Sequence, residues 1–496
     1  MQGRKQYQEK LFTTFRLSDR IPESNFYRRL NNLLDLRFLY KATEKYYGKE
    51  GNPGLDPVVF FKLLLTGYFQ NLQSDRSIIE NAKLRLDILF FIGYDIDEEL
   101  PWHSTLSRTR QLFGEDVFQM LFKEVLKQCI EKGMVAGNRQ AIDSVLVKAN
   151  VSMDSLRTLT ILQDGEEYLS SLVEDEDNNE VEKTEGKGKS NSRRRSLTDP
   201  DARIATKPGK PRQMNYLGQV SVDTANHVIT NIEAHHADKR DSECFEDVLN
   251  QTVENLKENG LKIKEVLADT NYSSADALKA AIKNNIDAYI PNMGQYKTER
   301  PGFKYVIEDD YYQCDQGVKL SFKALRTSRE KNLMRDYRST TEDCRNCSLK
   351  STCLGKTQSY KTISHSQEKP LYDQINERMQ TSYARKLRRL RQSTVEPVIG
   401  TLVNFMAMKR IRTIGIQQAN KYLIGAAVAY NIKKWMKWQN KNPKIVAMVL
   451  PIPEKLKTEP LFSTLFQQIG AGINDFLFKI QNSLKYQPNY CLQIHF

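Results

Sequence analysis

Residues 141–292 alternate short apolar runs with amphipathic stretches of helical period, and this order constrains the fold more than any other feature of the chain. The apolar run AIDSVLVKA (141–149) comes first. Residues 214–234 then alternate apolar and polar residues around a polar turn, as a hairpin does. Helical and apolar segments follow in turn at 242–260, 263–269, 275–285 and 287–292. The order strand, hairpin, helix, strand, helix, strand predicts an α/β fold with a mixed sheet flanked by helices.

The first 140 residues carry signals for helix ends rather than for strands. Asp56-Pro57 predicts an N-cap followed by proline at the first helical position. Ser77 and Glu80 fit a capping box, and a helix at 115–132 ends before Gly133. The stretch WHSTLSRTR (102–110) between these helices is interpreted as a short polar segment. We expect an all-α domain at 1–140 that contacts DNA or dimerises; a purely structural helical domain fits the same pattern.

A strongly charged stretch interrupts the sheet domain. Residues 164–185 carry ten acidic residues and one lysine, whereas residues 186–212 carry nine basic and two acidic residues. So few apolar side chains cannot form a core, so we predict a disordered charged loop at 164–212. The basic half could contact DNA, although a solvated linker is the simpler interpretation.

The whole chain is basic, with 496 residues, a formal net charge of +13 and a pI near 9.1. Such an excess favours a polyanionic partner, either nucleic acid or an anionic membrane surface. No apolar stretch reaches the roughly 18 residues that a membrane-spanning helix needs, so no membrane is expected. The first ten residues lack the apolar segment of a signal peptide, and seven cysteines suggest a reducing compartment. We therefore expect a cytoplasmic protein.

Two aspartates flank strands of the predicted sheet. Asp143 precedes the apolar run Val145–Val147, and Asp269 ends the strand at 263–269. The first and fourth strands of a mixed sheet often lie side by side, so the two carboxylates could meet. Two such charges repel unless a cation lies between them, and Mg²⁺ prefers oxygen ligands of this kind. Each aspartate could instead cap a turn.

A third carboxylate, Glu396, lies in a basic stretch. Residues 375–412 carry nine basic and two acidic residues. A basic helix with one central glutamate would let cations hold a phosphate backbone while the glutamate reaches a metal. A solvated basic helix with an intrahelical ion pair is the alternative. Pro397 predicts a kink, or a new helix that starts near Ser393-Thr394.

Three blocks of the sequence together resemble a known family. AIDSVLVKANVS, EVLADTNYSSADAL and VEPVIGTLV resemble the catalytic blocks of bacterial insertion-sequence transposases of the DDE class, in which Asp269 follows Asp143 by 126 positions and Glu396 follows Asp269 by 127. Residues 199–229 and the helical domain also resemble that family, so the likeness covers about residues 15–440. It implies a ribonuclease-H-like catalytic domain at 141–440, with Asp143, Asp269 and Glu396 as catalytic residues and metal ligands.

The resemblance also implies a reaction and its partners. We expect a DNA transposase that catalyses metal-dependent cleavage and strand transfer at the ends of an insertion sequence. It would use two Mg²⁺ ions, for which Mn²⁺ can substitute, and bind double-stranded DNA as a homodimer or larger assembly, associated with the nucleoid. The alternative is a catalytically inactive end-binding protein or repressor. Predicted DNA contacts are Arg385, Lys386, Arg388, Arg389, Arg391, Lys409, Arg410 and Arg412.

The family pattern is not matched at every position. Many relatives place a tyrosine in the basic run before the glutamate and a lysine after it. Here Arg388 or Arg389 stands near the first place and Val403-Asn404 near the second. This departure bears on auxiliary DNA contacts and leaves the three carboxylates intact.

Cysteines cluster in an insertion at about 293–374, before the last catalytic helix. Cys344, Cys347 and Cys353 follow one another closely, and Cys314 lies upstream. Such thiolates could hold a structural Zn²⁺, with His365 as a rival for the fourth ligand; reduced cysteines are the alternative. Residues 441–496 form a C-terminal extension to which the sequence assigns no role.

Overall fold

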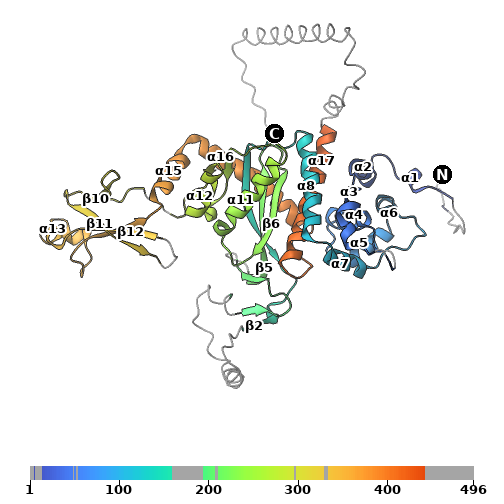
Figure 1. Cartoon of the computed structure of the whole chain (residues 1–496), viewed down its shortest axis with the longest axis horizontal. Helices are drawn as coiled ribbons and strands as arrows, with labels where there is room; N and C mark the ends of the chain where they lie inside the picture. Colours follow the sequence, from blue (N-terminus) through green and yellow to red (C-terminus); the bar gives the residue numbers. More distant parts are fainter. Residues whose placement is uncertain are drawn as a thin grey trace, which may run out of the picture. The chain divides into compact units, whose positions relative to one another are not determined.

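The computed structural model describes residues 5, 14–48, 50–51, 54–158, 191, 194–206, 211–294, 296, 298–328 and 333–441 (Figure 1). Residues 1–436 form one compact unit, and a second begins at Lys437. Most of the predicted loop at 164–212 and nearly all of the extension at 441–496 lie outside the described residues.

The N-terminal region is helical, as predicted. Asp56 caps α4 by accepting hydrogen bonds from the backbone N–H groups of Val58 and Val59, and Pro57 is its first residue. α5 begins earlier than predicted, because Ser74 and not Ser77 is its N-cap. The helices are α1 (Leu17–Arg20), α2 (Phe26–Leu33), α3 (Phe38–Thr43), η1 (Glu44–Tyr46), α4 (Pro57–Phe69), α5 (Asp75–Lys83), α6 (Leu86–Ile92), α7 (His103–Leu112) and α8 (Glu115–Glu131).

The stretch at 102–110 is a helix rather than a polar connection. It forms most of α7, whose residues Leu106, Thr109 and Arg110 are buried. The prediction was wrong because polar side chains dominate the stretch, while a single leucine and the stem of an arginine suffice to bury one face of a short helix.

The central domain is the ribonuclease-H-like mixed sheet that the sequence predicts. Its order is β4-β5-β1-β7-β8, with β6 paired to β5. β1 runs antiparallel to β5 and parallel to β7, so the first and fourth strands are neighbours. The strands are β1 (Arg139–Lys148), β4 (Arg203–Ala205), β5 (Gln213–Asp223), β6 (Ile229–His236), β7 (Glu265–Leu267) and β8 (Asp287–Tyr289).

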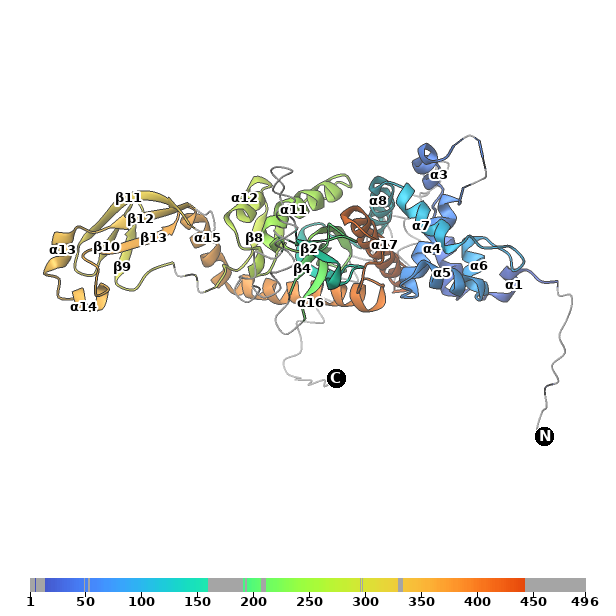
Figure 2. The same cartoon turned by 90° about the horizontal axis from the view of Figure 1, so that it is seen from below.

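Helices cover both faces of this sheet (Figures 1 and 2). Leu217 packs with Cys244 of α11 (Asp241–Lys257) on one face. Gly218 points to the opposite face, because successive strand residues alternate, and a Cβ there would lie 3.3 Å from Leu423 of α17 (Ile416–Lys441). α12 (Ala275–Lys283) packs beside α11, and α16 (Ser382–Phe405) packs against β1.

Part of the predicted charged loop is ordered, which corrects its boundary. β3 (Arg194–Ser196) pairs with β2 (Leu156–Thr158), and β4 extends the main sheet. The segment is fixed because Asp199, fully buried, accepts a 2.7 Å hydrogen bond from the hydroxyl of Tyr216. Counting charges in the sequence does not reveal such a buried partner.

The insertion before the last helices contains a sheet of its own, which the sequence analysis did not predict. Its order is β13-β12-β11-β10-β9, all antiparallel. Tyr312, Leu320, Tyr337 and Ile363 form its small core. The strands are β9 (Phe303–Val306), β10 (Tyr311–Cys314), β11 (Lys319–Thr327), β12 (Leu333–Arg338) and β13 (Thr362–Ser366).

α15 (Lys369–Gln380) leads from the insertion to α16, which runs without a break through Pro397. The predicted helix start near Ser393 was therefore wrong. Residues on both sides of the proline are fixed by packing, because Val395, Val398 and Leu402 are buried. Tertiary packing here outweighs the roughly 3 kcal/mol that an interior proline costs.

Candidate active site

Asp143 lies in the middle of β1, on the face covered by α16. One carboxylate oxygen accepts a 2.9 Å hydrogen bond from the backbone N–H of Ser144, and the other accepts one of 2.9 Å from the guanidinium of Arg391. Burial raises the pKa of Asp143, against the lowering influence of Arg391; the charge of Asp269 raises it further. The side chain keeps 19% of its surface exposed, so it is reachable from solvent.

Asp269 lies just beyond the end of β7, as the sequence predicts. Ala141 pairs with Leu267, so Asp143 and Asp269 each follow that pair by two residues on parallel neighbouring strands. Asp269 also caps the short helix η3 (Thr270–Tyr272) through a 3.0 Å hydrogen bond from the N–H of Asn271. Burial raises its pKa as well. The turn-capping role and a place beside Asp143 are therefore compatible.

Glu396 stands on the exposed side of α16. It follows Arg391 by five positions, which turns it about 140° around the helix axis at 3.6 residues per turn. Arg391 points to Asp143 from the buried face, whereas the side chain of Glu396 is exposed. Within the described residues no recorded hydrogen bond joins Glu396 to either aspartate, and no three acidic, histidine or cysteine side chains are grouped to hold a metal. Arg385 and Arg389 share its exposed face.

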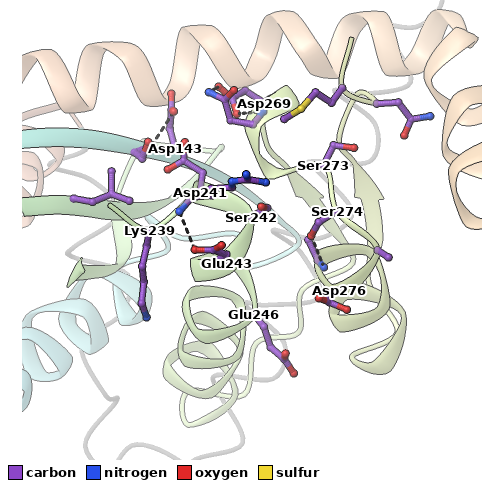
Figure 3. A pocket seen from close by; sticks show the side chains of 18 of the residues that line it. Asp143, Lys239, Asp241, Ser242, Glu243, Glu246, Asp269, Ser273, Ser274 and Asp276 are labelled. Carbon is purple, nitrogen blue, oxygen red and sulfur yellow. Dashed lines mark hydrogen bonds between the residues drawn. The ribbon is translucent and has the colours of Figure 1, made fainter. Parts of the chain in front are cut away.

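A cleft of about 1280 Å³ opens beside the two aspartates. Figure 3 shows Asp143, Asp241 and Asp269 at this cleft, with Glu243 and Glu246 of α11 farther along it. Asp241 accepts a 2.8 Å hydrogen bond from the amide of Gln219, and the buried Tyr272 donates to the same glutamine. Asp241 was not predicted as a site residue, because an acidic first residue is common in any amphipathic helix.

The predicted DNA-contact residues divide into two groups. Arg385, Lys386, Arg388, Arg389 and Lys409 are exposed and available to a polyanion. The others bond within the protein: Arg391 to Asp143, Arg410 to Asn150 at 3.0 Å, and Arg412 to Gln73. Arg410 and Arg412 thereby fix the segment after α16 against the end of β1 and the N-terminal helices.

The cysteines of the insertion do not form a metal site in this structure. Cys314 ends β10, while Cys344 and Cys353 belong to α13 (Thr341–Arg345) and α14 (Lys350–Cys353), and no three-ligand group is found among the described residues. Cys344 instead contacts the hydroxyl of Ser339 at 3.1 Å. His365 uses both ring nitrogens on Tyr312 and Tyr337. Zinc binding by these cysteines therefore stays a prediction.

Two family models match the chain. A transposase domain (DUF772) matches residues 15–112, and a transposase DDE domain matches residues 313–436. The chain is a DNA transposase of the DDE class. This confirms the family and the function that the sequence resemblance implies, and it does not favour the inactive end-binding alternative. The DDE match contains Glu396 and the cysteines, whereas Asp143 and Asp269 lie upstream of it.

Solved structures similar to this transposase are themselves transposase complexes. The piggyBac transposase synaptic complex with hairpin DNA is 10% identical, covering 86% of this chain and 80% of that one at a TM-score of 0.27. The Mos1 transposase paired-end complex with left transposon end is 11% identical, covering 51% and 64% at a TM-score of 0.16. At such TM-scores the family assignment rests on the two domain matches. No curated protein matches the chain, and no described helix is long and apolar enough to cross a membrane.

Proposed function

We propose that this transposase cleaves DNA at the ends of an insertion sequence and joins it to target DNA by metal-dependent phosphoryl transfer, with Asp143, Asp269 and Glu396 as its catalytic carboxylates. The observation that carries the proposal is the placement of Asp143 and Asp269, each two residues after the Ala141–Leu267 pair of the neighbouring strands β1 and β7, at an open cleft. The pKa of each is raised, mainly by burial. A cation between two such carboxylates would relieve their repulsion.

The donor set fits a hard divalent cation such as Mg²⁺, for which Mn²⁺ can substitute. Asp143 and Asp269 offer carboxylate oxygens, the ligands such ions prefer, and both line the cleft. Glu396 belongs to the proposal through its place on α16, the helix that packs against β1. A bound divalent cation supplies a nucleophile at neutral pH and stabilises the leaving oxygen.

The chain's own residues hold the substrate for this chemistry. Arg385 and Arg389 share the exposed face of α16 with Glu396, so a phosphate backbone held by the arginines would pass the glutamate. In cleavage the oxygen of water, having lost a proton, bonds to phosphorus as the bond to the 3′-oxygen breaks, which leaves a 3′-hydroxyl. In strand transfer the oxygen of that 3′-hydroxyl loses its proton and bonds to a phosphorus of the target DNA, as the bond from this phosphorus to the target's own 3′-oxygen breaks and that oxygen takes up a proton. Phosphate contacts of this kind fix position without reading sequence.

The size of the cleft suits a polymer. Small-molecule sites usually measure about 300–1,000 Å³, and this cleft of about 1280 Å³ is larger and open. Two transposon ends require two active sites, so we propose a homodimer or larger assembly on double-stranded DNA, at the nucleoid.

The proposal is tested with Asp143→Asn and Asp269→Asn, which remove the charge and keep the shape. We expect cleavage of duplex DNA in Mg²⁺ to fall at least about 10³-fold, a loss of roughly 4 kcal/mol of transition-state stabilisation, while affinity for the duplex stays within about twofold. Asp276→Asn, at an exposed carboxylate elsewhere in the cleft, is the matched control and should cleave normally. Normal cleavage by either test variant would refute the assignment.

A further inference from the structure

Arg391 stands where a cation would neutralise Asp143. Its guanidinium lies 2.9 Å from the carboxylate, and the two side chains are only 13% and 19% exposed. Arg391 also lowers the pKa of Asp269, so its charge acts on both aspartates. The other oxygen of Asp143 is held by the N–H of Ser144. Arg391 thus binds the carboxylate oxygen of Asp143 that accepts no hydrogen bond from Ser144.

Arg391 differs from the other cations of α16 in the direction it faces. Arg391 lies near the centre of the buried face of α16, which is defined by Ala384, Leu387, Thr394, Val395, Val398 and Leu402. Arg385, Lys386, Arg388 and Arg389 are exposed. The cations of α16 therefore face outward, except for Arg391, which points to the proposed metal ligand Asp143.

We propose that Arg391 is the resident counter-cation of the active site: it competes with a divalent cation for Asp143 and, once displaced, binds a phosphate of the DNA in the cleft. The inference rests on the proposed function, because it assumes that Asp143 binds the cation. Guanidinium and a divalent cation cannot share the same carboxylate oxygen at bonding distance. A guanidinium that leaves a carboxylate keeps five donors, which suit a phosphate equally well.

The exchange couples DNA binding to metal binding. A phosphate that draws Arg391 away from Asp143 frees the carboxylate for the cation, and a cation that takes Asp143 frees Arg391 for the phosphate. Coupling between two binding equilibria is reciprocal. DNA should therefore raise the affinity of the protein for the cation, and this gain should require Arg391.

The experiment measures Mn²⁺ affinity of the full chain by isothermal titration, without DNA. Binding that Asp143→Asn abolishes defines the site. We expect Arg391→Gln to bind Mn²⁺ about five- to tenfold more tightly than wild type, the effect of removing one partly buried ion-pair competitor. Arg391→Lys keeps a cation and should fall between the two. Lys262→Gln removes an equal charge at an exposed lysine that does not touch Asp143 and should match wild type.

A second titration adds a saturating 30-base-pair duplex of arbitrary sequence. Wild type should gain Mn²⁺ affinity on binding the duplex, and Arg391→Gln should gain none. If Asp143-dependent binding is present and Arg391→Gln binds no more tightly than wild type, this inference is wrong while the proposed function stands. If no variant shows Asp143-dependent binding with or without DNA, the metal site and the inference fail together.

Discussion

Arg110 lies buried between α7 and α5, where its guanidinium forms a two-pronged ion pair with Asp75. One of the two hydrogen bonds measures 2.9 Å, and the side chains are 10% and 20% exposed. Its backbone carbonyl also accepts a hydrogen bond from Lys421 of α17. The arginine therefore stabilises the helical domain and is not available to DNA.

Removal of Asp75 should be costly, because it leaves a buried guanidinium without its partner. We expect Asp75→Ala to lower the free energy of unfolding by about 3 kcal/mol, measured by urea denaturation. The control is Asp116→Ala, whose partner Lys45 is exposed; this change should cost at most about 1 kcal/mol. Equal losses in both variants would mean that the buried pair is no more stabilising than a surface pair.

The residues of the site were predictable to different degrees. Asp143 and Asp269 follow from strand order, because adjacent parallel strands place residues of equivalent register side by side. The contact of Arg391 with Asp143 was not predicted. The spacing of Leu387, Val398 and Leu402 nevertheless places Arg391 on the apolar face of α16 and Glu396 away from that face. Asp241 could not be found, since only the folded chain brings the start of α11 to the cleft.

At the scale of elements, α4 and α17 approach closely at Gly425. A Cβ at this position would lie 2.6 Å from the ring of Tyr68, whose hydroxyl donates a 2.9 Å hydrogen bond to the carbonyl of Tyr422. The ring is 6% exposed and therefore has little room to move. The glycine permits the packing of α17 on the helical domain.

Gly425→Ala should therefore destabilise the protein by about 1–3 kcal/mol through overpacking, read from thermal or urea unfolding. Gly400→Ala in α16 is the control, because nothing lies within 4 Å of its added Cβ. There the change should be neutral or stabilising by up to about 1 kcal/mol, as alanine favours a helix over glycine. The opposite order of stabilities would contradict the described contact.

The sheet of the insertion contains a half-buried histidine that makes it sensitive to acid. Burial and the nearby charges of Lys369 and Arg335 lower the pKa of His365 to about 4. As the pH falls below about 6.5, His365 takes up a proton in the unfolded chain, whereas in the folded chain it stays neutral until the pH approaches 4. The stabilising effect of the neutral ring is thus complete above pH 6.5 and is lost as the pH falls toward 4.

We expect protection of residues 303–328 and 333–366 from hydrogen exchange to decrease between pH 6.5 and 4.5, after correction for intrinsic exchange rates. The loss should be about 1 kcal/mol, because solvent screens a half-exposed ring. His365→Gln keeps hydrogen-bonding groups for Tyr312 and Tyr337 but does not titrate, so its protection should change less with pH. An equal pH dependence in both proteins would exclude His365 as the cause.

Among elements, the sequence predicted those with clear periodicity and long apolar runs. The strands of the insertion were missed because β11 is exposed along most of its length and lacks the alternation of a half-buried strand. β3 and β4 were missed because they lie in a charged stretch and are three residues long. Contacts with residues distant in the sequence hold these two strands in place, and a local sequence pattern cannot predict such contacts.

At the scale of the whole molecule, the chain has a net charge of +13, and part of its positive charge is concentrated in the exposed cations of α16. The logarithm of DNA affinity should fall linearly with the logarithm of salt concentration, with a slope of about 0.9 per phosphate contact. A variant that replaces three of these cations by glutamine should lower the slope by up to roughly 2.7. The three substitutions are Arg385→Gln, Arg388→Gln and Arg389→Gln.

A second triple variant controls for net charge. It carries substitutions at three exposed lysines that do not belong to α16: Lys257→Gln, Lys262→Gln and Lys264→Gln. Fluorescence anisotropy with a labelled duplex at several salt concentrations gives both slopes. The control slope should stay close to that of wild type. Equal losses in the two variants would show that charge alone, and not the α16 surface, governs binding.

The most direct test of the account is end cleavage. Wild type and Glu396→Gln are each incubated in Mg²⁺ with labelled duplex DNA that contains the sequences flanking the gene. The account predicts that wild type cuts at a defined end and leaves a 3′-hydroxyl, while the variant binds the same duplex and leaves it intact. Cutting by both proteins, or binding by both with no cutting by either in Mg²⁺ or Mn²⁺, would contradict it.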